Sequence, residues 1–309
     1  MDKIESEKLE PSAALATYGK SFNWAKKFLG KKMGADAATL YRFCRVLDDM
    51  ADGDIANGPQ RLFNIRDGLL KDYSTNDPLL DDFEFFIKSK KLPKLVIISL
   101  IDGLLSDQEN VSIKNEFELL RYCYRVAGTV GILMCNVLNS DESNATDYAI
   151  DLGIAMQLTN IARDILEDAK MGRRYLPESW VGDISPEEIV QISQTPQSEK
   201  VQNICLGSER LLELAEKYYL SGLMGCSYLP IRAHIAISIA AVVYRQIGIK
   251  IINKKYQWFE GREFTSINEK IRCSIYGSTL LYKRLFKPAN HKKSLHDELR
   301  GLPYVKKYI

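Results

Sequence analysis

The sequence lacks several features that would point to common protein classes. Its 309 residues carry 42 Lys or Arg against 40 Asp or Glu, a net charge of +2, so no overall field favours nucleic acid as a partner. The six cysteines include no C-x-x-C pair, which argues against a zinc site or a disulfide scaffold and favours reduced core residues. The charged N-terminus has no apolar stretch of the kind a secretory signal requires. These absences predict a cytoplasmic protein.

Long hydrophobic runs are scarce as well. The most apolar window, Ile235 to Tyr244, is too short to span a bilayer, which takes about 20 residues, and we interpret it as a buried helix. Sustained alternation of apolar and polar residues is hard to find, whereas apolar residues recur at steps of three and four. This pattern predicts an all-α fold in one domain, 1–309, with an irregular stretch at 168–198. The expected helices span roughly 12–30, 36–52, 59–73, 78–90, 94–106, 115–139, 144–168, 198–221, 229–253 and 264–286.

Acidic residues crowd the end of the second of these helices. Asp48, Asp49, Asp52 and Asp54 fall within seven residues. At about 100° per residue, Asp48 and Asp52 share one face with Tyr41 and Arg45. Like charges four residues apart repel, and the C-terminal end of a helix dipole also disfavours acids. A bound cation would reverse that repulsion.

A second row of oxygen donors lies on the helix predicted at 144–168. Gln157, Asn160, Asp164 and Asp168 fall within about 80° on a helical projection, beside an apolar row of isoleucines. Such a row suits a cavity wall, and hard oxygen donors suit Mg²⁺, with Mn²⁺ as an alternative, completed by substrate phosphates. Either acidic motif alone is more often a solvated helix face, and a calcium-binding loop is excluded because Met50 and Pro59 stand where oxygen ligands are needed.

With these motifs in place, nearly the whole chain resembles the squalene and phytoene synthases, the head-to-head prenyl synthases, and looks most like the bacterial phytoene synthases. The resemblance implies an isoprenoid-synthase helical bundle in which two acidic motifs face each other across a central cavity. It rests on Lys20-Ser21-Phe22, Tyr41-x-Phe43-Cys44-Arg45-x-x-Asp48-Asp49-x-x-Asp52, Tyr122-Cys123-Tyr124-x-Val126-Ala127-Gly128-x-Val130-Gly131, Gln157-Leu-Thr-Asn160-Ile-x-Arg163-Asp164 and Gly172-Arg173-x-Tyr175-Leu176-Pro177.

The resemblance also implies roles for individual residues. The metal ligands would be Asp48, Asp52, Asn160, Asp164 and Asp168, and the catalytic residues Asp48, Asp52, Asp164, Asp168, Tyr122 and Tyr244. Prenyl diphosphates would be bound by Lys20, Ser21, Tyr41, Arg45, Gln157, Arg163, Arg173 and Arg262. One departure is visible, because Gly19 stands where family members commonly have a serine. The small residues Ala127, Gly128, Gly131 and Gly153 either let helices approach closely or leave room for a polyprenyl chain.

The implied reaction joins two geranylgeranyl diphosphates head to head, through a cyclopropyl diphosphate, to give phytoene in carotenoid biosynthesis. No histidine falls in the motifs, so released pyrophosphate or a tyrosine is the expected proton acceptor. NADPH is not expected, since no dinucleotide fingerprint is present. The alternatives are a C15-using dehydrosqualene, squalene or presqualene diphosphate synthase, a head-to-tail prenyltransferase or terpene cyclase, and, from a different class, an inactive helical scaffold.

The C-terminal residues 283–309 form a basic tail. They hold eight Lys or Arg against two acids, interleaved with Leu, Tyr and Phe. Such a segment is either a solvated tail or a site of peripheral attachment to an anionic membrane surface, where long prenyl substrates reside. The sequence predicts no oligomeric state.

Overall fold

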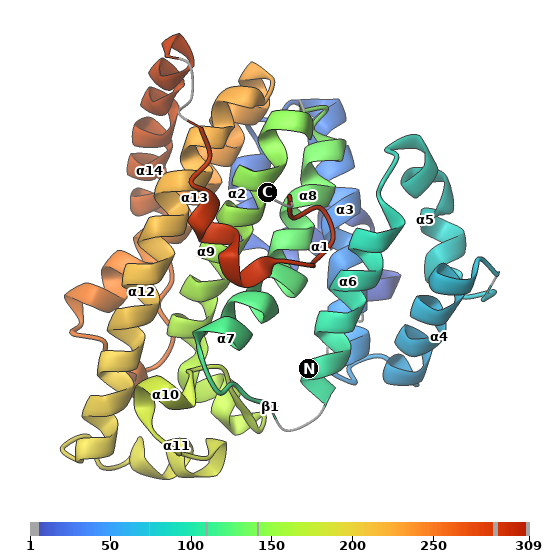
Figure 1. Ribbon diagram of the computed structural model, residues 1–309. Coiled ribbons are helices and arrows are strands. Elements are labelled where there is room, and N and C mark those ends of the chain that lie inside the picture. The colour runs from blue at the N-terminus through green and yellow to red at the C-terminus, as the bar shows by residue number, and fades with distance from the viewer. Residues whose placement is uncertain (1–5, 74, 109–110, 141, 287–289, 307–309) are drawn as a thin grey trace.

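Helices follow one another along almost the whole chain, as the spacing of apolar residues predicts (Figure 1). The computed structural model describes residues 6–73, 75–108, 111–140, 142–286 and 290–306. Its helices are α1 (Pro11–Tyr18), α2 (Lys20–Lys26), α3 (Lys31–Ala51), α4 (Gly58–Lys71), α5 (Pro78–Ser89), α6 (Lys94–Leu105), α7 (Glu116–Cys123), α8 (Thr129–Val137), α9 (Glu142–Lys170), α10 (Glu178–Val181), α11 (Pro186–Ile192), α12 (Glu199–Gly225), α13 (Ile231–Asn253) and α14 (Ile267–Thr279).

Two of the predicted helices are broken in ways that the local pattern does not show. The span 12–30 divides into α1 and α2 at Gly19. A Cβ atom on Gly19 would lie 2.8 Å from the ring of Tyr41, so the tyrosine packs where any side chain at this position would stand. The span 115–139 contains a π-helical turn, Tyr124–Gly128, between α7 and α8.

The stretch between 168 and 198 is more ordered than the sequence predicts. It holds α10, α11 and the strand β2 (Arg173–Arg174), which pairs in parallel with β1 (Val111–Ser112). Pairs of two-residue strands are invisible to a periodicity argument, because alternation needs several residues to register. At the other end of the chain, the span predicted at 264–286 changes after Thr279 into a 3₁₀ helix, Leu280–Leu285.

Helix α9 occupies the middle of the bundle, packed against α8, α12 and α13 (Figure 1). Glycines explain how closely its neighbours approach. A Cβ on Gly131 would lie 2.2 Å from the Ala149 carbonyl oxygen, and one on Gly153 would lie 2.3 Å from the Ala127 carbonyl oxygen. Real Cβ atoms never come so close to backbone, so these glycines serve the contact between α9 and the segment 124–137.

Helix α13 is long and apolar enough, by length and composition alone, to cross a membrane. Its most apolar window has a mean hydropathy of 1.7, and 56% of that window is buried inside the protein. Ala233, Ile239 and Val243 are fully enclosed and belong to the same hydrophobic core as the rest of the bundle. This burial fits the core helix predicted around Ile235 to Tyr244.

Residues 290–306 of the predicted C-terminal tail cross the face of the bundle as a strap over α7 and α9 (Figure 1). The Tyr124 hydroxyl donates to the carbonyl of Pro303, and the Tyr218 hydroxyl donates to that of Leu295 at 2.8 Å. His296 and Leu299 of this segment are themselves buried. This C-terminal strap is therefore packed onto the protein; residues 287–289 and 307–309 of the predicted tail lie outside the described residues.

Candidate active site

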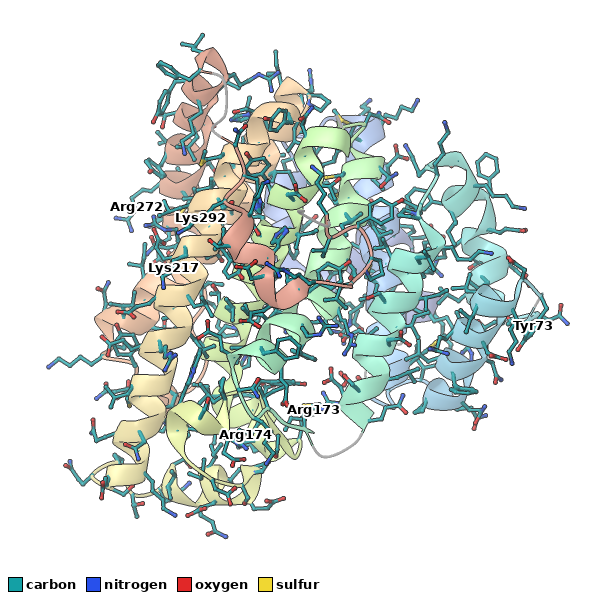
Figure 2. All side chains as sticks on the ribbon, in the orientation of Figure 1. Tyr73, Arg173, Arg174, Lys217, Arg272 and Lys292 are labelled. Carbon is teal, nitrogen blue, oxygen red and sulfur yellow. The ribbon has the colours of Figure 1, made fainter. Side chains whose placement is uncertain are left out.

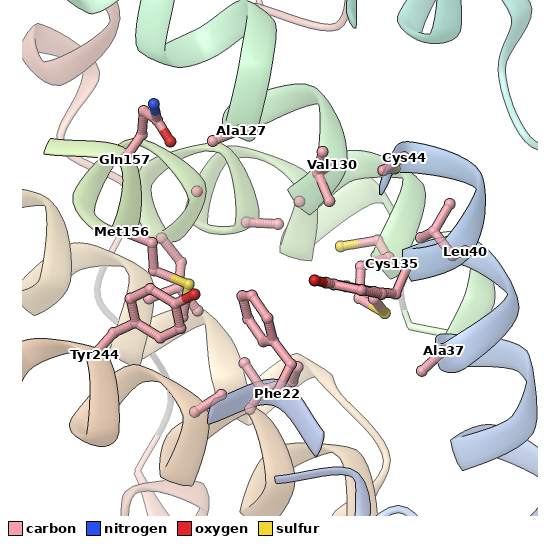
Figure 3. A pocket seen from close by; sticks show the side chains of 18 of the residues that line it. Phe22, Ala37, Leu40, Cys44, Ala127, Val130, Cys135, Met156, Gln157 and Tyr244 are labelled. Carbon is pink, nitrogen blue, oxygen red and sulfur yellow. The ribbon is translucent and has the colours of Figure 1, made fainter. Parts of the chain in front are cut away.

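A cavity of about 400 Å³ opens between α2, α3, α8, α9 and α13, a size typical of small-molecule sites. One end is polar and receives Arg45 and Asp48 from α3 and Gln157 and Asn160 from α9. The remainder is apolar. Figure 3 shows Phe22, Met156 and Tyr244 converging on its centre from α2, α9 and α13.

The acidic row on α3 is held by an arginine on the same helix. Arg45 donates to Asp48 at 3.0 Å and also to Asp49, which is almost completely buried. Asp49 faces this arginine within the core, whereas Asp48 lines the cavity. Because neighbouring residues of a helix point in different directions, Asp49 is paired inside the core while Asp48 is available in the cavity.

The acidic row on α9 is also covered by arginines. Arg163 contacts both carboxylate oxygens of Asp164, at 2.8 and 2.5 Å. Arg262, from the segment before α14, reaches the same carboxylate at 2.7 and 3.1 Å. Two permanently charged forks therefore converge on one acid, an arrangement suited to gripping a diphosphate as well.

Both rows lie near Arg173, whose charge opposes the rise in the pKa of Asp168. Arg173, on β2 just beyond α9, donates to Asp52 of the α3 row at 2.9 Å, although the two residues are 121 positions apart. Its Nε atom also donates to the Asp107 backbone carbonyl at 3.1 Å. Figure 2 labels Arg173 at this end of the bundle. The short pairing of β1 with β2 holds Arg173 in place between the rows.

Asp107 is the functional candidate that the sequence did not reveal. It lies in a short 3₁₀ turn after α6, and it lines the cavity. Its two carboxylate oxygens accept hydrogen bonds from the Tyr122 and Tyr175 hydroxyls, both at 2.9 Å, and these two rings stack. Burial raises the pKa of Asp107 to about 6, although both hydroxyls oppose the shift. A lone acid behind an apolar helix offers no local pattern by which to find it.

Some oxygen atoms at this site have no hydrogen-bond partner and are therefore available to bind a cation. Asn160 donates from its amide to Gln157 at 3.3 Å, while its buried carbonyl oxygen accepts no hydrogen bond. Burial and the nearby Asp164 raise the pKa of Asp168 well above its ordinary value. Orphaned acceptors and crowded carboxylates are costly in isolation, and an Mg²⁺ ion relieves both penalties.

Asp48 carries the same signature. Burial, and then the charges of Asp52, Asp49 and Asp107, raise its pKa to about 7 against the opposing charge of Arg45. Its side chain keeps 43% of its surface accessible and lines the cavity. The acid is thus partly protonated near neutral pH when no cation is bound.

This shift predicts a pH-dependent stability for the metal-free protein. A carboxyl whose pKa is higher folded than unfolded, about 3.9, binds more protons in the native state between these values, so stability falls as pH rises through that window. We expect Asp48→Asn to melt higher than wild type at pH 8 with a chelator present, and the gap to shrink at pH 5. Calorimetry at both pH values measures it; an equal or lower melting temperature at pH 8 contradicts the assignment.

The other predicted residues divide into those that reach the cavity and those that do not. Tyr41, Tyr122, Gln157 and Tyr244 line it, and burial raises the pKa values of the three tyrosines. Lys20 and Ser21 are not among the lining residues, in contrast to Phe22 of the same helix. Lys20 is exposed, and its predicted contact with diphosphate would require the side chain to turn toward the cavity.

Known proteins match both the sequence and the fold. The squalene/phytoene synthase family matches residues 15–269. The 15-cis-phytoene synthase of Pantoea ananas is 33% identical over 277 residues, covering 85% of this chain and 88% of its own. The phytoene synthase of Pseudescherichia vulneris is 34% identical over 273 residues, covering 83% and 86%.

Among solved structures, a dehydrosqualene synthase in complex with a ligand superposes with a TM-score of 0.75 at 24% identity, covering 88% of this chain and 95% of that one. Squalene synthase HpnC from Alicyclobacillus acidocaldarius gives a TM-score of 0.64 at 19% identity, with coverages of 78% and 90%. The predicted all-α isoprenoid-synthase fold is confirmed. The sequence match over most of its length shows that the chain belongs to the squalene/phytoene synthase family.

Proposed function

We propose that this protein is a phytoene synthase, a prenyltransferase that joins two geranylgeranyl diphosphates head to head. The observation that carries the proposal is a largely apolar cavity lined by Asp48 of one oxygen-donor row and Asn160 of the other, in a chain whose relatives are named phytoene synthases. We also propose a cytoplasmic location with peripheral contact to a membrane.

The arginines would change partners when substrate binds. Arg45, Arg163, Arg173 and Arg262 neutralise the acids of the two rows. Bound Mg²⁺, held by Asp48, Asp52, Asn160, Asp164 and Asp168, would supply charge that makes diphosphate a better leaving group. The metal charge would then replace the arginines in neutralising the acids, and the guanidinium groups could bind the diphosphate oxygens instead. Lys20 and Ser21 remain predicted contacts to diphosphate.

The apolar part of the cavity would hold the prenyl chains and exclude water. An allylic cation formed there would survive until the double bond of the second chain attacks it, because bulk water is kept out. Loss of a proton then closes the ring of the cyclopropyl diphosphate. The rings of Phe22 and Tyr244, 5.0 Å apart, present π-faces that stabilise positive charge. Among the described residues no histidine lines this cavity, which supports pyrophosphate or a tyrosine as the acceptor of the final proton.

Product analysis tests the proposal. Purified protein is incubated with Mg²⁺ and either C15 or C20 diphosphate, with and without NADPH, and the extracted hydrocarbons are identified. We expect phytoene from the C20 substrate, unchanged by NADPH. Dehydrosqualene or squalene as the main product would establish the C15 alternative. Absence of pyrophosphate release from both substrates would favour the inactive scaffold.

A further inference from the structure

We infer that α14 and the segment that follows it dock on an anionic membrane surface. Exposed apolar side chains line this part of the molecule. Ile267 is 68% exposed, Ile271 45% and Ile275 65%. Their spacing of four residues places them in one row along the helix. Phe264, which precedes these isoleucines in the chain, is also exposed, as are four residues that follow them: Tyr276, Tyr282, Leu285 and Phe286.

The row is the outer face of a helix whose inner face is fully used. Cys273 is buried, and a Cβ on Gly277 would lie 2.9 Å from the Cα of Ile239 on α13. The Trp24 indole of α2 donates to Ser274 at 2.8 Å. Figure 1 shows α14 at the edge of the bundle, outside α13. A further surface therefore has to cover the outer isoleucines if they are to leave water.

The charges around the row select the partner. Between 264 and 286 the chain holds Lys270, Arg272, Lys283 and Arg284 against a single acid, Glu269. Glu269 caps the helix with Ser266 and lies 3.7 Å from Lys250. Figure 2 shows Arg272 extending outward from α14. An apolar row flanked by cations matches a surface that is oily inside and negative at its headgroups.

The neighbouring helix α2 adds to the positive rim. Lys27 is exposed and lies over the Trp24 ring at 4.5 Å. Burial, and then the charges of Lys20 and Lys27, lower the pKa of Lys270, so cations of α2 and α14 act on each other at this face. Two copies of this chain meeting through the same face would bring these cations together, so a self-dimer is disfavoured.

The docking face adjoins the wall of the cavity. Helix α2 supplies both Trp24, bonded to α14, and the cavity residues Phe22 and Ala25. The functional meaning of this proximity rests on the proposed function, because only then would apolar substrates and a C40 product pass between the cavity and the bilayer. Of the predicted basic tail, residues 283–286 belong to this docking face, whereas residues 290–306 are packed onto the bundle as the strap.

Vesicle sedimentation tests the inference. The probes are phosphatidylcholine vesicles with and without phosphatidylglycerol, and the variant is Ile271→Asp with Ile275→Asp. We expect wild type to pellet with the anionic vesicles and to be released by salt. The variant should bind at least about tenfold more weakly, because two apolar contacts are replaced by like charges. The control is Phe85→Asp with Leu95→Asp, at 82% and 60% exposed sites on α5 and α6; α5 lies on the opposite side of the molecule (Figure 1).

Three results would overturn the inference: no binding of wild type to anionic vesicles, equal binding by the α14 variant, or a wild-type dimer in sedimentation velocity that the α14 variant abolishes. Phytoene formation in detergent is measured in parallel and should be the same for wild type and the α14 variant. Because the binding assay contains no substrate, its outcome stands whether or not the product proves to be phytoene.

Discussion

We expect Asp164→Ala and Asp48→Ala each to lower Mg²⁺-dependent turnover by at least about a hundredfold. Each acid belongs to one of the two rows, and removing one fixed charge aimed at a reacting centre commonly costs this much. Asp164 also holds both Arg163 and Arg262 in place, so its loss disorders two diphosphate contacts as well. Release of pyrophosphate at saturating substrate measures the effect.

The matched control is Asp54→Ala. Asp54 belongs to the same run of acids but is exposed, and it lies beyond the end of α3, so near wild-type turnover is expected. Circular dichroism confirms that the variants are folded before rates are compared. Near-normal activity of either Asp48→Ala or Asp164→Ala would remove that residue from the reaction.

Asp151→Asn is expected to destabilise the protein by about 3 kcal/mol at pH 7. Asp151 lies on α9 with no exposed surface, and it accepts from Ser221 of α12. His291 and His296 of the C-terminal strap each hold one of its oxygens at 2.8 Å. Removing the charge from a buried, multiply bonded carboxylate leaves several partners unsatisfied. For a chain of this size the melting temperature should fall by about 6 °C.

The effect should depend on pH. Burial alone would raise the pKa of Asp151, but the hydrogen bonds and charges of the two histidines outweigh it and hold the pKa below its ordinary value. A carboxyl with a lowered folded pKa stabilises above its unfolded pKa, about 3.9, and that stability is lost as pH falls through the folded value. The gap between wild type and Asp151→Asn should therefore be full at pH 7 and close in acid.

The control for this prediction is Asp297→Asn, an acid of the same strap whose exposed ion pair with Arg300 should contribute less than about 1 kcal/mol. Because the ligand atoms of Asp151, His291 and His296 lie within 4.8 Å of one another, melting is repeated with a chelator. An unchanged melting temperature identifies a hydrogen-bonded clamp, and a fall identifies a metal-held one. Equal stability of Asp151→Asn and wild type would show that the strap is not fastened here.

The sequence by itself determined the helical class and the oxygen-donor rows, because both depend on a period of 3.6 residues that operates within one helix. Asp48 and Asp52 had to share a face of α3, as did Asn160, Asp164 and Asp168 on α9, whatever the rest of the chain did. The family motifs added predicted diphosphate contacts for Arg45, Arg163 and Arg173, because each of these arginines stands at a matching position in a motif.

Only the tertiary structure decided which distant groups meet. Arg173 reaches Asp52 across 121 residues, and Asp107 joins Tyr122 to Tyr175, because a two-residue strand pair brings the chain after α6 beside the chain after α9. Likewise, two histidines in a basic tail gave no sign of the buried aspartate that binds them. Contacts of this kind depend on how helices pack, and packing is set by the shapes of side chains far apart in the chain rather than by any local period.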